Sequence, residues 1–208
     1  MNDSSGNRMD KESEDRISSL KEAFHHVSFL SAHSYILHIQ DKHMEKGNIP
    51  LFIQWDKRWG KTVYGDGTIA SNGCGPTALA MVIAGLTKRS DVYPDVLAEY
   101  SMRRGFYVPG VGSSWELMTR AALDYGLQVQ TIDMDETAIF AKLRANHPII
   151  CSVGPGDFTA IGHFIVLIGI DKQGKILVHD SKSRIRSKRS YEFTRLKKQV
   201  RQVWVYGK

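Results

Sequence analysis

The chain has 208 residues and a net charge of +6, with 42% hydrophobic and 24% charged residues. This composition is typical of a soluble globular protein and excludes a fibrous or a wholly disordered chain. The length suits one sizeable domain plus an extension, and two independent domains are not expected. No apolar stretch approaches the roughly 20 residues that a membrane span needs, and the polar start is unlike a secretory signal.

The first residues leave the compartment open. We expect a cytoplasmic protein if the chain begins at its natural start. We expect an extracellular or envelope-associated one if a signal or anchor has been removed. The chain has two cysteines, Cys74 and Cys151, which cannot make a disulfide framework. No Cys/His ligand spacing suggests zinc, so we expect two free thiols and no metal or other cofactor.

Residues 1–46 are predicted to be an extension and residues 47–208 the main domain. Residues 1–16 are polar and poor in apolar side chains, which is typical of a mobile tail. From Ile17 to Phe29 the apolar residues recur at helical spacing, which predicts an amphipathic helix. This extension is interpreted as a linker or as a regulatory pro-segment that occupies the active site.

Helices dominate the first half of the main domain. An apolar helix is predicted to begin around Cys74 and to end near Gly85, and a second is predicted over 92–103. A third is predicted over 113–125, with Ser113 or Ser114 as its N-cap. A glycine-rich turn over 64–68 precedes the first of these helices.

Strands dominate the second half. One further helix is predicted over 135–145. The strand-like runs cover residues 127–132, 148–153, 163–170, 175–179 and 202–206. A hairpin turn over 171–174 joins two of them. Helices followed by an antiparallel sheet indicate an α+β fold.

Cys74 lies where a glycine-rich turn becomes an apolar helix, in the run Ser-Asn-Gly-Cys-Gly-Pro-Thr-Ala over residues 71–78. The positive end of a helix favours thiolate over thiol, and the thiolate is the nucleophile. Gly73 and Gly75 would let the backbone pass close to a substrate, and Pro76 suits the first helical position. The alternative is a small buried cysteine that fills space.

A cysteine nucleophile needs a base, and histidine has a suitable pKa. His163 opens the most apolar predicted strand, and Asp180 ends the neighbouring strand of the predicted hairpin. These two residues are therefore expected side by side, with the carboxylate orienting the imidazole. The alternatives are a buried structural histidine and an aspartate that only caps the turn at Ser181.

Four motifs occur in a fixed order: Gln-Trp-Asp-Lys-Arg-Trp over 54–59, the run around Cys74, Gly-His-Phe-Ile-Val-Leu-Ile-Gly-Ile-Asp over 162–171, and Val-His-Asp-Ser over 178–181. In this order, from about residue 50 to 206, the chain resembles the papain-like cysteine peptidases of the bacteriocin-processing, double-glycine leader peptidase type. Within that type it is similar to the stand-alone branch that lacks a transporter.

This resemblance implies a papain-like fold with the cysteine on the central helix and the histidine and aspartate on the sheet. It implies that Cys74 is the nucleophile, His163 the general base and acid, and Asp180 the orienting residue. It also implies that Gln54 donates its amide to the oxyanion, with the Cys74 N–H as the other donor. The 20 residues between Gln54 and Cys74 would have to loop back. A structural glutamine is the alternative, and Asn72 is then the fallback donor.

Other features carry less weight. Cys151 lies inside an apolar strand and is interpreted as core packing. Trp55, Trp59 and Trp115 either line a cleft or pack in the core. Residues 182–201 contain nine basic residues and one acid. This basic segment is interpreted as a solvated edge, as a contact for anionic envelope polymer or lipid, or as a site for acidic substrates. No nucleic-acid motif accompanies the charge, so nucleic acid is not expected as a partner.

The sequence thus predicts a monomeric cysteine peptidase that acts on a peptide or protein substrate through a Cys-His-Asp triad and a thioester acyl-enzyme. One alternative is an acyltransferase or deamidase on the same fold, because such enzymes share the catalytic residues. The other is a non-catalytic binding module of the cell envelope.

Overall fold

The structure is a computed structural model that describes residues 49–208. The helix predicted at 17–29 and the boundary predicted after residue 46 lie outside the described residues. No helix of the described part is long and apolar enough to cross a membrane.

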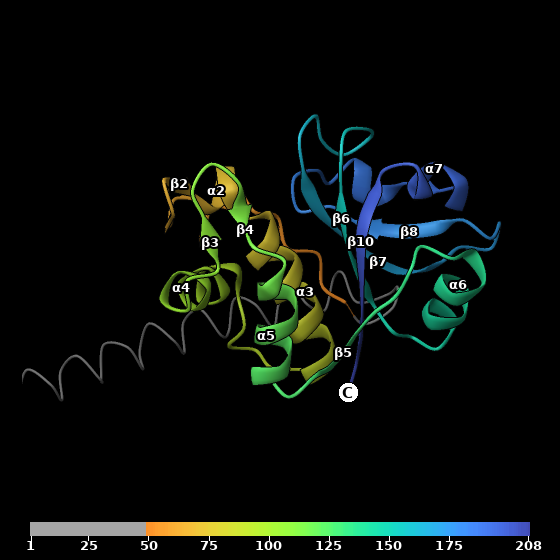
Figure 1. The fold of residues 1–208 in the computed structure, drawn as a ribbon, viewed down its shortest axis with the longest axis horizontal. Helices are drawn as coiled ribbons and strands as arrows, with labels where there is room; N and C mark the ends of the chain where they lie inside the picture. Colours follow the sequence, from red (N-terminus) through yellow and green to blue (C-terminus); the bar gives the residue numbers. More distant parts are fainter. Residues whose placement is uncertain (1–48) are drawn as a thin grey trace, which may run out of the picture. The chain divides into compact units, whose positions relative to one another are not determined.

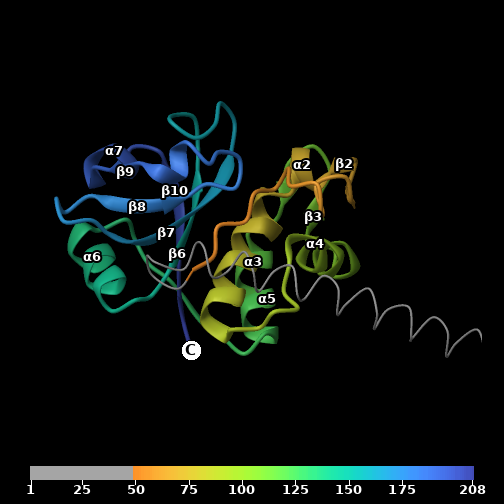
Figure 2. The ribbon, with the colours of Figure 1, turned by 180° about the vertical axis from the view of Figure 1, so that it is seen from behind.

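The helices from the first half of the domain lie on one side and the sheet lies on the other, as the two opposite views in Figures 1 and 2 show. The helical side comes first in the chain and contains α2, α3, α4 and α5, which cover Ile69–Asn72, Cys74–Thr87, Pro94–Arg103 and Glu116–Asp124. Two short hairpins flank these helices, formed by β1 (Val63–Tyr64) with β2 (Gly67–Thr68) and by β3 (Tyr107–Val108) with β4 (Gly112–Ser113).

A six-stranded sheet forms the second side, in the order β5-β10-β6-β7-β8-β9, and all of its neighbouring strands are antiparallel. These strands cover Gln128–Thr131, Val200–Gly207, Ile149–Val153, His163–Ile170, Ile176–His179 and Ser190–Tyr191. The remaining elements are α6 (Glu136–Arg144), the 3-10 helix η1 (Arg186–Lys188) and α7 (Phe193–Lys197). The predicted α+β fold is therefore confirmed.

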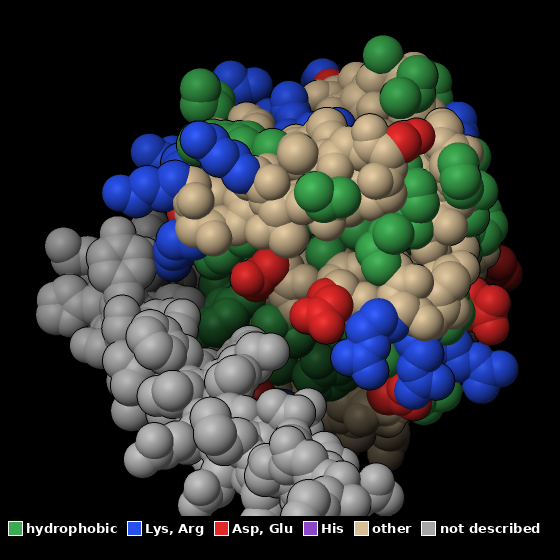
Figure 3. All heavy atoms as spheres, turned by 90° about the vertical axis from the view of Figure 1, so that its left-hand side faces the viewer, with side chains coloured by type: hydrophobic (Ala, Val, Ile, Leu, Met, Phe, Trp, Pro, Cys, Tyr) green, Lys and Arg blue, Asp and Glu red, His purple; other side chains and the backbone are tan. Residues whose placement is uncertain are grey.

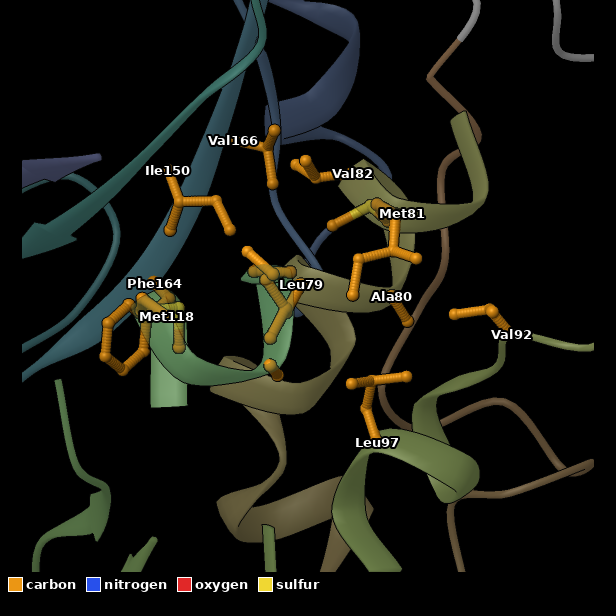
Figure 4. Close-up of a cluster of buried hydrophobic side chains, with 14 of the residues drawn as sticks. Leu79, Ala80, Met81, Val82, Val92, Leu97, Met118, Ile150, Phe164 and Val166 are labelled. Carbon is orange, nitrogen blue, oxygen red and sulfur yellow. The ribbon is translucent and has the colours of Figure 1, made fainter. Parts of the chain in front are cut away.

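Alternation along the central strands divides the core into two layers. Ile150 and Phe164 pack with the buried faces of α3, α4 and α5, whereas their neighbours Ile149 and Ile165 pack with α6 on the other side of the sheet. Side chains of successive strand residues point to opposite faces, so a sheet covered on both sides reads as a continuous apolar run. Figure 4 shows the first layer, in which Leu79 and Val82 of α3 lie among residues from the sheet and the other helices.

The helix α3 is buried almost along its whole length, from Gly75 to Gly85. It packs between the other helices and β7, which makes it the central helix of the domain. A helix buried on all sides explains why its sequence is apolar throughout rather than on one stripe. Its first residue is therefore held in a fixed position against the sheet.

Some predicted element ends are wrong. The helix α3 ends at Thr87, two residues beyond Gly85, and Lys88 after it takes a left-handed conformation with φ of 60°. Neither Ser113 nor Ser114 caps α5, because its N-cap is Trp115 and Ser113 belongs to β4. The Ser113 hydroxyl instead hydrogen bonds to the hydroxyl of Tyr64 at 2.7 Å, so a tertiary contact uses the group that the pattern assigned to a cap.

The face in Figure 3 belongs to the helical side of the domain, the left-hand side of Figure 1. On it, blue Lys and Arg side chains alternate with red Asp and Glu side chains and with green hydrophobic ones, so neither sign of charge dominates. The basic segment 182–201 belongs to the sheet side, where it forms η1, β9, α7 and the start of β10.

Candidate active site

Cys74 is the first residue of α3 and is half-buried. The N–H groups of a first helical turn have no intrahelical acceptor, so the Cys74 N–H is available to a ligand, and the helix dipole favours negative charge there. Pro76 was predicted to be the first helical residue, but it is the third. The first turn tolerates it for the same reason, since a missing N–H there breaks no helical bond.

The glycines beside the thiol serve the packing of the chain on itself. A Cβ on Gly75 would lie 2.4 Å from the Ser113 hydroxyl oxygen, and one on Gly73 would lie 2.6 Å from a methyl group of Ile69. Gly75 thus allows β4 to lie directly against the start of α3. The close approach that the sequence pattern assigned to a substrate is made by Ser113.

His163 is the first residue of β7 and is only 2% exposed. Its Nε2–H donates to the Asp180 carboxylate, with 2.8 Å between Nε2 and Oδ1. This bond fixes the tautomer, because a carboxylate can only accept. The other ring nitrogen, Nδ1, is buried and has no hydrogen-bond partner among the described residues. The Cys74 side chain is close enough to the imidazole to interact with it electrostatically.

The pKa values of the thiol and the imidazole move in opposite directions. Burial alone would raise the pKa of Cys74, but the neighbouring imidazole of His163, with its positive charge, and the charge of Lys182 lower it. Burial alone would lower the pKa of His163, but Asp180 and Cys74 raise it to about 9. Both shifts favour transfer of the thiol proton to the imidazole. Such a transfer gives the thiolate, which is the reactive form of cysteine.

Asp180 follows β8 and is completely buried. Besides His163, its Oδ1 accepts the backbone N–H of Lys182 at 2.8 Å, and its Oδ2 accepts Nε–H of Arg186. Burial would raise its pKa, but these hydrogen bonds and the charge of His163 lower it. The alternative in which Asp180 only caps the turn at Ser181 does not account for its hydrogen bond with His163. Asp180 accepts from this turn and from the histidine at once.

Gln54 is completely buried and reaches the start of the central helix. Its Nε2 donates to the Ala70 carbonyl at 2.8 Å, and its Oε1 accepts the hydroxyl of Ser181 at 2.8 Å. Because a carbonyl only accepts, the contact with Ala70 fixes which end of the amide is nitrogen. The segment between Gln54 and Cys74 does loop back, through the hairpin of β1 and β2 and the helix α2.

Asn72, the fallback donor, faces elsewhere. Its Nδ2 donates to a carboxylate oxygen of Asp66 at 2.9 Å, near the hydroxyl of Tyr107. Two of the three tryptophans are half-exposed, with Trp55 at 51% and Trp115 at 48%, so the core interpretation holds only for Trp59. The Trp55 indole donates to the Lys182 carbonyl at 3.1 Å, which places this exposed ring beside the segment that carries Asp180.

Part of the basic segment has partners within the domain. Arg186 binds Asp180, Arg195 forms an ion pair with Asp157, and the Arg184 guanidinium lies 5.6 Å from the ring centre of Trp55. The predicted contact with anionic envelope polymer or lipid stays a prediction. The described residues contain no cluster of three or more His, Cys, Asp or Glu that could hold a metal ion.

The sequence matches the Peptidase_C39-like family over residues 46–208. The chain belongs to this family. This Peptidase_C39-like protein is similar to the peptidase domain of Streptococcus ComA, a bifunctional ABC transporter involved in a quorum-sensing pathway. The TM-score is 0.51 with 19% sequence identity, over 65% of this chain and 90% of that domain.

A second similar structure is a double-glycine motif protease from an AMS/PCAT transporter in complex with its leader peptide. Its TM-score is 0.45 with 19% identity, over 77% of this chain and 92% of that one. No curated protein matches the sequence significantly. The resemblance to papain-like, double-glycine leader peptidases is confirmed, and family and fold point to a cysteine peptidase.

The second thiol of this Peptidase_C39-like protein should be unreactive. Cys151 is completely buried in β6, and burial raises its pKa far above the usual range. We expect one iodoacetamide adduct per folded chain and two after unfolding in guanidinium, counted by intact mass. Adducts on both cysteines of the folded protein would show that this region of the core opens readily.

The pair of Cys74 and His163 should leave a signature in stability. Alone, a histidine with a raised pKa stabilises the fold below its unfolded pKa of about 6.5, and this is lost as the pH rises through about 9. A cysteine with a lowered pKa stabilises above its unfolded pKa of about 8.5, and this is lost as the pH falls through its folded pKa.

Together these effects cancel near neutrality. At pH values above both 6.5 and the folded pKa of Cys74, and below about 8.5, the unfolded pair holds one proton, on sulfur, and the folded pair holds one, on nitrogen. The free energy of unfolding should therefore be insensitive to this pair in that range. In Cys74→Ala only the histidine remains, so stability should fall as the pH rises. Urea unfolding of the native chain and of Cys74→Ala at several pH values up to about 8.5 tests this. If the free energy of unfolding depends on pH in the same way in the two proteins, the ion pair is contradicted.

Proposed function

We propose that this protein is a cysteine peptidase in which Cys74, His163 and Asp180 form the catalytic triad. The observation that carries the proposal is the buried His163–Asp180 pair, with 2.8 Å between Nε2 and Oδ1, beside the half-buried Cys74 thiol, whose pKa the imidazole lowers. Family membership supports the reaction class. A peptide is the proposed substrate, and the reaction itself requires no cofactor.

The proposed reaction begins with attack of the Cys74 thiolate on a peptide carbonyl carbon. The carbonyl π electrons move to oxygen and give a tetrahedral oxyanion. The His163 imidazolium then donates its Nδ1 proton to the leaving amine nitrogen as the C–N bond breaks, and a thioester remains. Neutral His163 next takes a proton from water, whose oxygen attacks the thioester. The acid leaves and the thiolate and imidazolium are restored.

The oxyanion needs donors at the start of α3. We propose the Cys74 N–H as one and the Gln54 side-chain amide as the other. The Gln54 amide nitrogen carries two hydrogens, and its contact with the Ala70 carbonyl at 2.8 Å holds it against α2, the short helix that precedes Cys74 in the chain. Its second contact, with the Ile69 carbonyl at 3.4 Å, is long enough to be exchanged for a substrate oxygen.

Digestion of a defined peptide pool tests the proposed function. The native chain should produce new N-termini, and Cys74→Ala should produce none. Mass spectrometry in ¹⁸O-labelled water, with a primary amine added in a parallel reaction, separates three outcomes. Labelled carboxylates at cleaved bonds indicate hydrolysis, amine adducts indicate acyl transfer, and loss of side-chain amides indicates deamidation. An unchanged pool in every reaction would contradict a peptidase and favour a binding module.

A further inference from the structure

One carboxylate oxygen of Asp180, Oδ2, accepts a hydrogen bond from a residue outside the triad. Its Oδ1 faces His163 and the Lys182 N–H, and its Oδ2 is bound by Nε–H of Arg186. The carboxylate is completely buried, and the arginine side chain keeps 29% of its surface exposed. A buried carboxylate with a positive partner on each side cannot rotate without giving up one of its ion pairs.

The surrounding loop is built to keep Arg186 in place. Arg186 opens the 3-10 helix η1, and its backbone N–H donates to the Ser183 hydroxyl at 3.1 Å. The Ser187 hydroxyl accepts the backbone N–H of Asp180 at 2.9 Å and donates within the same loop. The turn that follows Asp180 therefore folds back on it and delivers the guanidinium to its outer oxygen.

We propose that Arg186 is a positioning residue of the catalytic site, which fixes the Asp180 carboxylate in the orientation that accepts the His163 proton donor. The site then consists of four charges of alternating sign: thiolate, imidazolium, carboxylate and guanidinium. Arg186 touches neither the substrate nor the reacting atoms and acts through Asp180. This inference rests on the roles proposed above for the triad.

Three possible roles of Arg186 predict different changes in the pKa of His163 when the arginine is removed. If it positions Asp180, its removal lets the carboxylate leave His163, and the pKa of His163 falls. If it acts only through its charge, its removal raises the pKa of every nearby group, His163 included. If it only stabilises the fold, the pKa of His163 in the folded molecules does not change. The other titratable groups that face this site are Tyr191 toward Asp180, and Lys182 and Tyr64 toward Cys74.

The reaction of Cys74 with iodoacetate measures this pKa in the full chain. The anionic reagent is attracted by the imidazolium, so its rate should rise as the thiolate forms and fall again as His163 loses its proton. In Arg186→Ala this alkaline limb should move down by about one to two pH units. Arg189→Ala is the matched control. It removes the same charge three residues away, from a side chain that makes no hydrogen bond or ion pair to Asp180 in the described structure, and its limb should stay in place.

Chemical rescue separates positioning from folding. Arg186 lines a surface pocket of about 260 Å³, so free guanidinium ion has a path to the space that the alanine leaves. Millimolar guanidinium chloride should move the limb of Arg186→Ala back toward the native value, and sodium chloride should not. Should Arg186→Ala fail to fold, Arg186→Gln fills similar space without charge and is expected to shift in the same direction.

An unchanged limb, or one that moves to higher pH, would overturn the inference about Arg186. The proposed function is judged separately, from the native protein. If the native profile has no alkaline limb and its rate simply rises with the free-thiol pKa, the ion pair itself is absent. In that case the triad proposal fails before the arginine is considered.

Discussion

Replacement of His163 by alanine should abolish peptide hydrolysis, with a loss of about 10³-fold or more in rate at neutral pH. The imidazole lowers the pKa of Cys74, and in the proposed reaction it also carries the proton for the leaving amine, so one substitution should remove both functions. The measurement is the initial rate of cleavage of the peptides identified in the pool, at equal concentrations of folded enzyme.

His147→Ala is the control for the loss of a histidine. His147 is half-buried and bonds to the Tyr206 carbonyl at 2.9 Å through Nδ1, without contact to the triad. Its replacement should leave the cleavage rate within a few-fold of native. Retention of more than a tenth of the native rate in His163→Ala would contradict the role of His163 as acid and base.

Removal of Asp180 should damage the fold as well as the reaction. Asp180→Ala leaves His163, the Lys182 N–H and Arg186 without their shared acceptor inside the protein. Breaking a buried ion pair by removing one partner typically costs about 3 to 5 kcal/mol. We expect a loss of this size in the free energy of unfolding, measured in urea at neutral pH.

Asp180→Asn isolates the charge from the shape. Asparagine can still accept from His163 and fills the same volume, so it should lose less stability than alanine. The pKa of His163 should nevertheless fall, because the carboxylate charge that raises it is gone. Equal stability of the alanine variant and the native chain would show that the contacts around Asp180 contribute nothing to the fold.

The fold was predictable where a pattern had one physical explanation. The strand pairs around Ile149 and Ile165 are covered on both faces, which gives continuous apolar runs that no surface helix shows. Element ends were less predictable, because contacts between distant residues decide them. Ser113 has the properties of an N-cap, but it lies in β4, where its hydroxyl hydrogen bonds to the Tyr64 hydroxyl. The hairpins of β1 to β4 are two residues per strand and leave no periodic signal.

In the candidate site too, features set by local sequence were predictable and features set by contacts between distant residues were not. The hairpin between His163 and Asp180 is a local feature, so the pairing of these two residues could be inferred from the sequence. The position of Cys74 beside them was implied only by the resemblance to the peptidase family. Arg186 could not be singled out, because it lies in a run of basic residues whose members look alike. Its selection depends on the path of the loop after Asp180. The sequence suggests that Gly75 leaves room for a substrate, because a sequence alone does not show that Ser113 of β4 occupies that space.

The activated state of Cys74 is the central claim, and the pH dependence of its alkylation by iodoacetamide tests it most directly. The experiment uses Cys151→Ser, which leaves a single thiol. We expect a labelling midpoint below the value of about 8.5 for a free cysteine, because His163 lowers the pKa of Cys74, and a return of the midpoint toward that value in the additional His163→Ala variant. A midpoint near 8.5 that His163→Ala leaves unchanged would contradict the account, because the thiol would then not be paired with its base.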